Sequence, residues 1–357
     1  MARTIIAGSG SCIPPKSVSN ADFSDRVFYN DKGHPLGVPS RETLAKFQQI
    51  TGISNRRYAS PDADSISMAF EAARLAIESS GIEPGALDQI IVAHNFGNIS
   101  NSESSIDTLP SLASRIKHRL GIAAGGCVAY DILFGCPGFL QAFIIADALG
   151  KAGAAKYCLL IGTETLSRIT DPFDRDSMIF GDGAGAFVTS FSETGSNEKG
   201  FICSLTRSYT GEEVDYITMA KSNNPSHQSA RLYMKMKGRQ VYDFALRELP
   251  LLMKACLDKA GLPLQSLKKI FIHQTNARMD HAIVHALFQL YDQPVIPDNI
   301  APMIIDWLGN NSVATIPTLY DLVLTGKLPP HQLGEGDLVM FASVGAGLNM
   351  NVVCYRC

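Results

Sequence analysis

Two distant segments of the chain share one pattern, and this repeat restricts the fold more than any other feature. The segments are "GIEPGALDQIIVAHN" (81–95) and "GLPLQSLKKIFIHQTN" (261–276). Each has a glycine that ends a helical pattern, a proline turn, a leucine, two polar residues and a β-branched run that ends near a histidine. The repeat indicates two related α/β halves. A duplicated α/β plan places the ends of two strands at one central cleft, where such sheets commonly hold their sites.

Short apolar runs alternate with longer helical patterns along the whole chain. Because the strand runs are continuously apolar, each sheet is expected to be covered by helices on both faces. We predict strands at 4–13, 89–96, 127–132, 157–164 and 268–276, and helices at 67–81, 108–121, 136–153 and 240–261.

The polar stretch 192–200 is the expected connection between the halves, which gives an N-terminal half over 1–195 and a C-terminal half over 196–357. Two further polar segments, 27–49 and 208–239, do not fit the alternating plan. We predict that they are surface excursions that shape a substrate tunnel.

Composition excludes several classes of function. The 357 residues are 46% hydrophobic, enough for a large core, and the net charge is −3 without a basic block, which argues against nucleic-acid binding. The apolar runs are too short to span a bilayer, and the first residues do not read as a signal peptide, so a cytoplasmic protein is expected. The eight scattered cysteines are expected to be free thiols, and no His/Cys spacing indicates a metal site.

One cysteine, Cys136 in "YDILFGCPGF" (130–139), occupies a predicted strand-to-helix junction. The positive end of a helix dipole lowers the pKa of a thiol, so this position favours a nucleophile. Pro137 suits a first helical turn, and Gly138 permits close approach of another group. The alternative, a small hydrophobe in a core, remains open for Cys136 and is preferred for Cys127 and Cys158, which lie in strand patterns.

Three further segments supply polar groups at the ends of apolar runs. His273 in "FIHQTN" follows a buried strand, and His94 at the equivalent end in the first half is a minor candidate. "GNNS" (309–312) opens a helix, where Asn and Ser are also ordinary caps. "VGAG" (344–347) breaks a strand pattern with a turn that can aim backbone N–H groups into a cleft.

These pieces, in the order Cys, His, Asn and glycine turn, resemble the thiolase superfamily, and most closely the β-ketoacyl-acyl-carrier-protein synthase III group. The segments "TETLSRITDPFDRDSMIFGDGAGAFV" (163–188), "IHQTNARM" (272–279) and "GNNSVATIP" (309–317) also match motifs of that group. The resemblance covers nearly the whole chain. It implies a thiolase-like α/β fold in which duplicated halves form a five-layer αβαβα sandwich.

The resemblance also implies residue roles. Cys136 would accept the acyl group, while His273 and Asn310 would hydrogen-bond the thioester carbonyl of the second substrate. The backbone N–H groups of Cys136 and Ala346 would form the oxyanion hole, and Asp182 would organise a glycine-rich turn near a dimer interface. The substrate and pantetheine channel would be lined by Asn276, Gly238, Arg175 and Leu109.

The implied activity is that of an acyltransferase that performs a decarboxylative Claisen condensation. An acyl thioester loads Cys136, and a malonyl thioester then loses CO₂ and attacks the acyl group to give a β-ketoacyl product. No metal or redox cofactor is required. The substrates would be thioesters of coenzyme A or of acyl carrier protein phosphopantetheine, and the family implies a homodimer.

Several departures from the family pattern bear on the substrate. Positions near Lys46 and Ile50 lack the Trp and Arg that grip coenzyme A, Leu109 replaces a pocket Phe, and "GLNMN" replaces the family's ending. They predict a carrier-bound or longer acyl donor and a reshaped acceptor pocket.

Three alternatives stay open. One is a ketosynthase/cyclase that condenses two longer acyl chains to a cyclohexanedione or dialkylresorcinol, with Glu164 as a candidate extra base. The others are an acyl-thioester hydrolase and a non-catalytic acyl-binding protein.

Overall fold

The first half is built on a five-stranded mixed sheet. The computed structural model describes residues 3–99, 106–192 and 199–357. The strand order is β1-β9-β8-β4-β7, in which β4 is parallel to β7 and β8 while β9 is antiparallel to β8 and β1. Its strands are β1 (Arg3–Cys12), β4 (Gln89–Ala93), β7 (Val128–Ile132), β8 (Tyr157–Thr165) and β9 (Asp182–Ser192).

The second half repeats this order with four strands, β10-β15-β14-β13. Here β13 is parallel to β14, and β15 is antiparallel to both β14 and β10. The strands are β10 (Gly200–Ser208), β13 (Leu267–Ile272), β14 (Leu338–Gly345) and β15 (Asn349–Arg356). The second sheet therefore matches β1, β9, β8 and β4 of the first sheet strand for strand.

The repeated sequence segments fold into the same local structure. Gly81 ends α2 (Ser65–Ser80) and Gly261 ends α5 (Gly238–Ala260), each with φ 65° in the left-handed region that glycine adopts without strain. A short 3₁₀ turn then leads into β4 in one half and into β13 in the other. The duplication predicted from the sequence is thus present in the backbone.

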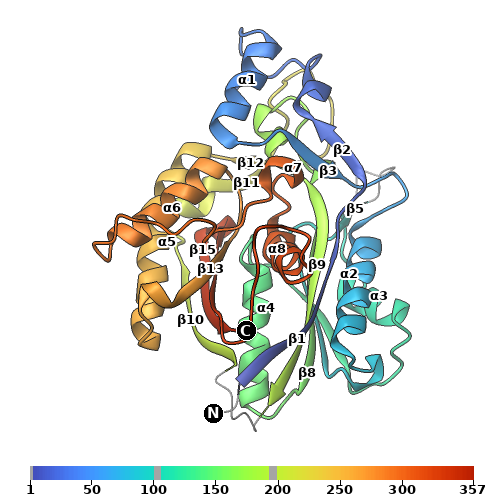
Figure 1. The fold of residues 1–357 in the computed structure, drawn as a ribbon. Helices are drawn as coiled ribbons and strands as arrows, with labels where there is room; N and C mark the ends of the chain where they lie inside the picture. Colours follow the sequence, from blue (N-terminus) through green and yellow to red (C-terminus); the bar gives the residue numbers. More distant parts are fainter. Residues whose placement is uncertain (1–2, 100–105, 193–198) are drawn as a thin grey trace.

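Helices on the outer faces of the two sheets and between them complete five layers (Figure 1). Helices α2 and α3 (Leu112–Arg119) cover the outer face of the first sheet, while α5 and α6 (Ala277–Gln289) cover that of the second. Helices α4 (Gly138–Lys151) and α8 (Thr315–Leu324) lie between the sheets and contact strands of both. The order of layers is the αβαβα sandwich that the resemblance implied.

Aromatic rings fill the space between the two sheets. Phe143 on α4 packs edge to face on Phe187 of β9 and on Phe341 of β14, with ring centroids 6.3 and 6.4 Å apart. Tyr320 on α8 contacts the same two strand residues. Both halves thus contribute to one central core, and α4 is held firmly by its buried face.

The predicted elements occur in order, with boundaries shifted by a few residues. The expected helix 136–153 begins at Gly138, and the expected helix 108–121 is confined to α3. The predicted connection between the halves lies largely in 193–198, outside the described residues, so the boundary between residues 195 and 196 stays a prediction.

The remaining helices and strands lie outside the two large sheets. Helix α1 (Ser40–Thr51) and the strands β2 (Lys16–Ser19) and β3 (Asn55–Tyr58) lie at the top of Figure 1. The hairpin of β11 (Ile217–Ala220) and β12 (Tyr233–Met236) lies beside α7 (Ile305–Leu308). Two short strands, β5 (Asn98–Ile99) and β6 (Ile106–Asp107), pair near α2.

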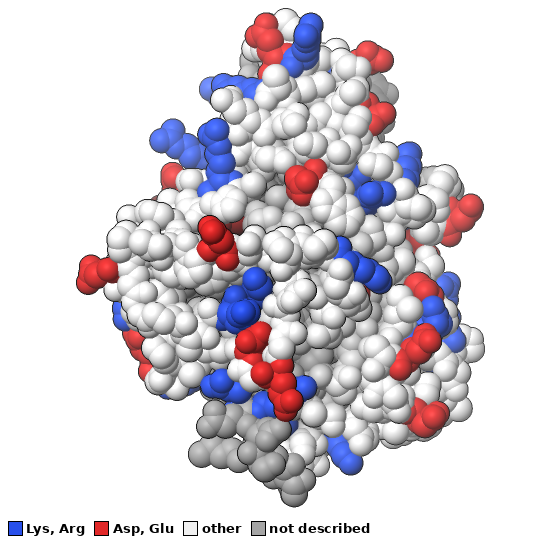
Figure 2. Space-filling view, viewed as in Figure 1, with Lys and Arg blue, Asp and Glu red and all other residues white. Residues whose placement is uncertain are grey.

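On the face shown in Figure 2, basic and acidic side chains are interspersed rather than gathered into one broad patch. Among the helices that the structure describes, none has the length and apolar character needed to cross a bilayer.

Candidate active site

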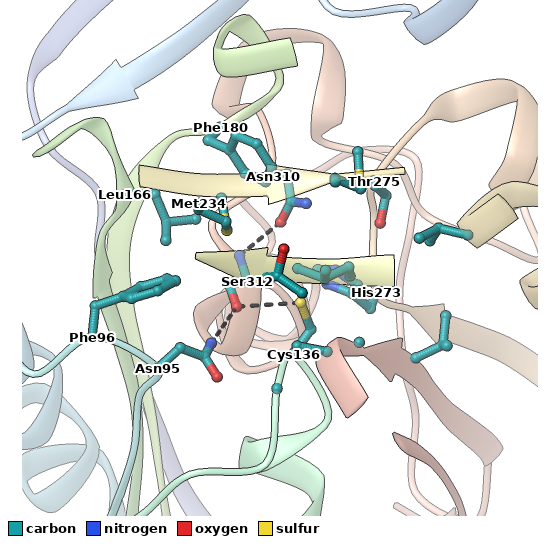
Figure 3. A pocket seen from close by; sticks show the side chains of 18 of the residues that line it. Asn95, Phe96, Cys136, Leu166, Phe180, Met234, His273, Thr275, Asn310 and Ser312 are labelled. Carbon is teal, nitrogen blue, oxygen red and sulfur yellow. Dashed lines mark hydrogen bonds between the residues drawn. The ribbon is translucent and has the colours of Figure 1, made fainter. Parts of the chain in front are cut away.

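A cavity of about 250 Å³ lies where the two halves meet (Figure 3). Cys136 from the first half and His273 and Asn310 from the second half all line it. Its apolar walls include Phe96, Leu166 and Phe180 from the first half and Met219, Met234 and Met236 from the β11–β12 hairpin. The structure therefore brings together the three side chains that the sequence singled out, in a largely apolar space.

Cys136 stands between β7 and the first turn of α4. The helix begins two residues later than predicted, because Pro137 occupies the cap position and its carbonyl accepts the N–H of Gln141. The N–H of Gly138 donates to Gly135 O (3.0 Å), which tightens the turn around the cysteine. The thiol thus lies at the N-terminal, positive end of a buried helix.

The turn that carries Cys136 touches the turn between β14 and β15. A Cβ added to Gly345 would lie 2.4 Å from the backbone nitrogen of Cys136, and one added to Gly135 would lie 2.7 Å from the nitrogen of Ala346. Only glycine permits such close approach of two backbones. The N–H groups of Cys136 and Ala346 consequently belong to adjoining segments beside the cavity.

The thiol is partly accessible from the cavity, although most of its surface is covered by protein. Burial raises the pKa of Cys136 to about 11, and the Ser312 hydroxyl, which donates to Sγ over 3.3 Å, acts in the opposite direction. Burial thus outweighs the lowering of this pKa that the helix N-terminus led us to expect, and the thiol is neutral at pH 7.

His273 follows the last residue of β13, and its own N–H donates to Ala342 O of β14 (2.8 Å). Burial lowers the pKa of its imidazole to about 4, so the ring is neutral at pH 7. Among the residues that the structure describes, none hydrogen-bonds its Nδ1. A neutral ring with an unbonded nitrogen is suited to hydrogen-bonding a substrate oxygen.

Asn310 is fixed by its backbone and by one side-chain oxygen. Its N–H donates to Ile179 O (2.9 Å), and its carbonyl accepts the N–H of Gly181 (2.8 Å). Its Oδ1 accepts the backbone N–H of Ser312 (2.8 Å). The amide Nδ2 is thereby oriented as the donor that a substrate carbonyl can meet.

Glu164, the candidate extra base, lies behind the cavity wall and does not line it. Burial raises the pKa of Glu164 to about 7. Its Oε1 accepts two hydrogen bonds from Asn95, one from the backbone N–H (2.8 Å) and one from Nδ2 (2.7 Å). The carboxyl group is thus engaged with Asn95 rather than directed at a substrate.

Four residues assigned to the channel do not line this cavity. The Asn276 side chain caps α6 by accepting the N–H groups of Arg278 and Met279. Gly238 is the first residue of α5, and Arg175 is exposed beside Asp176. Leu109 projects into solvent, with 86% of its surface exposed.

Two polar residues near the site have structural partners. Asp182 is buried and accepts hydrogen bonds from the N–H of Ala59 and from both the N–H and hydroxyl of Ser167, which agrees with an organising role. His94, the minor candidate, accepts the N–H of Gly97 at Nδ1 (3.0 Å) and contacts Asp131 through Nε2 (3.0 Å). Both of its nitrogens are therefore occupied away from the cavity.

Sequence reasoning missed Ser312, Asn95 and Thr275, which all line the cavity. In the sequence, Ser312 of "GNNS" cannot be told from an ordinary helix cap, although its place two residues after Asn310 is a usable signal. Thr275 gives no such signal, because nothing in "HQTN" shows which of three polar residues faces inward. No pattern in the sequence distinguished Asn95 from its neighbours.

The two excursions behave differently. Residues 217–219, 234 and 236 of the second excursion contribute to the cavity wall, as predicted for a tunnel-shaping segment. The first excursion, 27–49, does not line the cavity, because α1 packs against the 3₁₀ turn Asn20–Phe23 and α6 instead. Within the described ranges, no group of three or more His, Cys, Asp or Glu side chains is arranged to hold a metal ion.

Comparisons with known proteins agree with this architecture. Family models described as 3-oxoacyl-[acyl-carrier-protein] synthase III match residues 130–208 and, for its C-terminal part, residues 257–357. A β-ketoacyl-[acyl-carrier-protein] synthase III from Erythrobacter litoralis is 33% identical over 100% of both chains.

Two solved structures extend this agreement to the fold. A 3-oxoacyl-[acyl-carrier-protein] synthase III from Aquifex aeolicus has a TM-score of 0.79 and 29% identity, covering 99% of this chain and 100% of the other. The priming β-ketosynthase of the R1128 polyketide pathway has a TM-score of 0.79 and 25% identity, covering 99% and 96%. These relatives do not favour the hydrolase or ring-forming alternatives. The chain belongs to the β-ketoacyl-acyl-carrier-protein synthase III family of condensing acyltransferases.

Proposed function

We propose that Cys136 carries the acyl group and that His273 and Asn310 bind the second thioester during a decarboxylative condensation. The observation that carries the proposal is the convergence of these three side chains, from both halves, on one apolar cavity. The Cys136 thiol at a helix N-terminus supplies the nucleophile. The neutral imidazole and the oriented amide supply donors without charge.

In the first step, Sγ of Cys136 attacks the carbonyl carbon of an acyl thioester. The bond from that carbon to the donor's sulfur breaks, the donor leaves as a thiol, and the proton of Cys136 is transferred to it overall. The N–H groups of Cys136 and Ala346 stabilise the oxyanion of the tetrahedral intermediate, because the contact between their turns fixes both groups beforehand.

In the second step, a malonyl thioester enters and its terminal C–C bond breaks to release CO₂. Negative charge develops on the thioester oxygen as the enolate forms, and donors from His273 and Asn310 stabilise it. The enolate carbon attacks the acyl carbon, and the bond from that carbon to Sγ of Cys136 breaks. Cys136 leaves as a thiolate, which then takes up one proton. The product is a β-ketoacyl thioester, and the free enzyme is restored.

The cavity wall favours a donor longer than acetyl. Methionines of the β11–β12 hairpin form one side of the cavity, and methionine side chains adapt to chains of different shape. Leu109, where the family has a pocket Phe, does not line this cavity. We therefore include donors on both coenzyme A and a carrier protein in the substrate range to be tested.

A second copy of the chain is part of the proposal. Leu133 lines the cavity, yet 69% of its surface is exposed, and Leu109 is exposed to 86%. A homodimer whose contact covers both leucines would remove them from water. Sedimentation of wild type and of Leu109→Asp tests this. A dimer that persists unchanged in the variant would contradict a role for Leu109 in the contact.

Intact-mass measurement after incubation with acyl thioesters of increasing length tests the loading step. Wild type is expected to gain the mass of one acyl group, and Cys136→Ala to gain none. Cys12→Ala is a matched control, because Cys12 is also partly accessible but does not line the cavity, and it should load normally. Absence of an adduct on wild type with the whole panel would refute the nucleophile.

Addition of malonyl thioester to the loaded enzyme tests the condensing step. Release of CO₂ together with a β-ketoacyl product is expected. Release of free acid without CO₂ would show a hydrolase instead, and a cyclised product from two acyl chains would show the ring-forming activity.

A further inference from the structure

Ser312 joins the proposed nucleophile to the proposed donor. Its hydroxyl lies 3.3 Å from Sγ of Cys136, and its backbone N–H donates to Oδ1 of Asn310. The residue has φ 52°, in the left-handed region that side chains other than Asn and Asp seldom adopt. Strained backbone of this kind persists only where the surrounding structure enforces it, and it occurs preferentially at functional sites.

Asn95 and Glu164 fix the direction in which the Ser312 hydroxyl donates. Asn95 Nδ2 donates to Ser312 Oγ (3.0 Å) and to Glu164 Oε1 (2.7 Å). An amide nitrogen can only donate, so Ser312 Oγ accepts from Asn95 and its own hydrogen points to Sγ. The Glu164 carboxyl group fixes the Asn95 amide in this orientation, since the reversed amide would present its oxygen to the carboxyl oxygen.

We propose that Ser312 is a catalytic residue whose hydroxyl stabilises the Cys136 thiolate, and that Asn95 and Glu164 are positioning residues that hold the hydroxyl in place. The proposal rests on the function proposed above. The same hydrogen bond serves twice, because Sγ bears negative charge when it attacks the donor and again when it leaves after condensation. A hydrogen bond to an ionised acceptor is stronger than one between neutral groups.

The groups around the Cys136 thiol predict how its reactivity should change if Ser312 stabilises the thiolate. Ionised Glu164 opposes formation of the thiolate, while the Ser312 hydroxyl favours it. His94 and Asp182 act on the Glu164 carboxyl in opposite directions, and His273 is the remaining titratable group that shares the cavity. Removal of the Ser312 hydroxyl and removal of the Glu164 charge should therefore change thiol reactivity in opposite directions.

The test is the rate of alkylation of Cys136 by iodoacetamide between pH 6 and 9, followed by peptide mass spectrometry. Ser312→Ala and Ser312→Gly are expected to slow alkylation roughly tenfold, because one charge-assisted hydrogen bond is lost. Asn95→Ala should slow it less, since the hydroxyl remains but is free to rotate. Glu164→Gln keeps an acceptor for Asn95 without the charge, and should accelerate alkylation above pH 7, where the wild-type carboxyl group is ionised.

Ser312→Gly separates this role from a structural one. Glycine adopts φ 52° without strain, so this variant should unfold at a denaturant concentration close to that of wild type while its thiol reacts slowly. Thr318→Val is the matched control. It removes a hydroxyl from α8 that donates to Ala184 O outside the cavity, and it should leave alkylation unchanged.

Alkylation of both Ser312 variants within twofold of wild type at every pH would overturn the proposal. The readout needs no acyl substrate, so this failure is distinguishable from failure of the proposed function, which would appear as absence of an acyl adduct on wild type.

Discussion

The two halves of the molecule place a histidine at the same point of the repeated plan, and the two histidines differ completely in their surroundings. His94 follows β4, and both ring nitrogens are bonded, one to the N–H of Gly97 and one to Asp131. His273 follows β13, lines the cavity and has an Nδ1 without a partner among the described residues. The duplicated backbone provides the position, and the neighbouring groups decide whether the imidazole holds the fold or meets a substrate.

The largest difference between the two histidines is expected in the condensing step. His273→Ala should lower the rate of β-ketoacyl product formation by roughly 10²–10³-fold, the usual cost of losing one donor to a developing oxyanion. Acyl loading of Cys136 should continue, because it uses a different set of donors. Both are measured on one sample, by intact mass and by product release. A variant that neither loads nor condenses would contradict this division of roles.

Substitution of His94 is expected to lower stability rather than activity. His94→Ala should lower the free energy of unfolding by about 3 kcal/mol, because the buried N–H of Gly97 loses its acceptor and Asp131 loses one of its hydrogen-bond partners. Activity per folded molecule should stay close to that of wild type. Denaturant unfolding measures the loss, and His118→Ala on the exposed face of α3 is the control, with a change within about 0.5 kcal/mol. If the His94 variant were as stable as wild type, the structural role assigned to His94 would be wrong.

A smaller effect concerns the dependence of stability on pH. The pKa of His273 is about 4 in the fold and 6.5 ordinarily, so the unfolded chain binds a proton between these values that the fold does not. The His273 contribution to stability therefore falls as pH drops, by about 2 kcal/mol between pH 7 and 5. Glu164, with a raised pKa, acts in the opposite direction over part of this range.

The His273 contribution is isolated by comparing wild type with His273→Gln, in which Glu164 is unchanged. Between pH 7 and 5, wild type should lose about 2 kcal/mol more stability than the variant. Parallel curves for the two proteins would show that this imidazole is not buried in its neutral form.

Much of the fold followed from the sequence because repetition and apolar periodicity are local signals. They predicted the two halves, the strand ends at His94 and His273, and a cysteine near the start of a buried helix. Periodicity could not decide which of several adjacent polar residues turns inward. In 273–276, Gln274 bonds to Pro302 and Ile304, Thr275 lines the cavity and Asn276 caps α6.

The interactions that the sequence did not predict depend on contacts between distant segments. Ser312 meets the thiol only because its backbone has a positive φ and because the two halves pack together. The course of the first excursion depends on α1 packing beside α6, which no local pattern encodes. The family resemblance implied roles for Cys136 and Asn310. It did not predict that the hydroxyl of Ser312 would hydrogen-bond the Cys136 thiol.

The close contact between the Cys136 turn and the Gly345 turn also bears on how the protein matures. These residues lie far apart in the chain, and contacts of this kind form late because a long loop must close first. The Cys136 turn meets the Ala346 N–H only after β14 and β15 have docked against the first half. In a partly folded chain, the Cys136 thiol would be present without the Ala346 N–H that stabilises the oxyanion. The fraction of molecules that can be acylated would therefore measure the fraction that is fully folded.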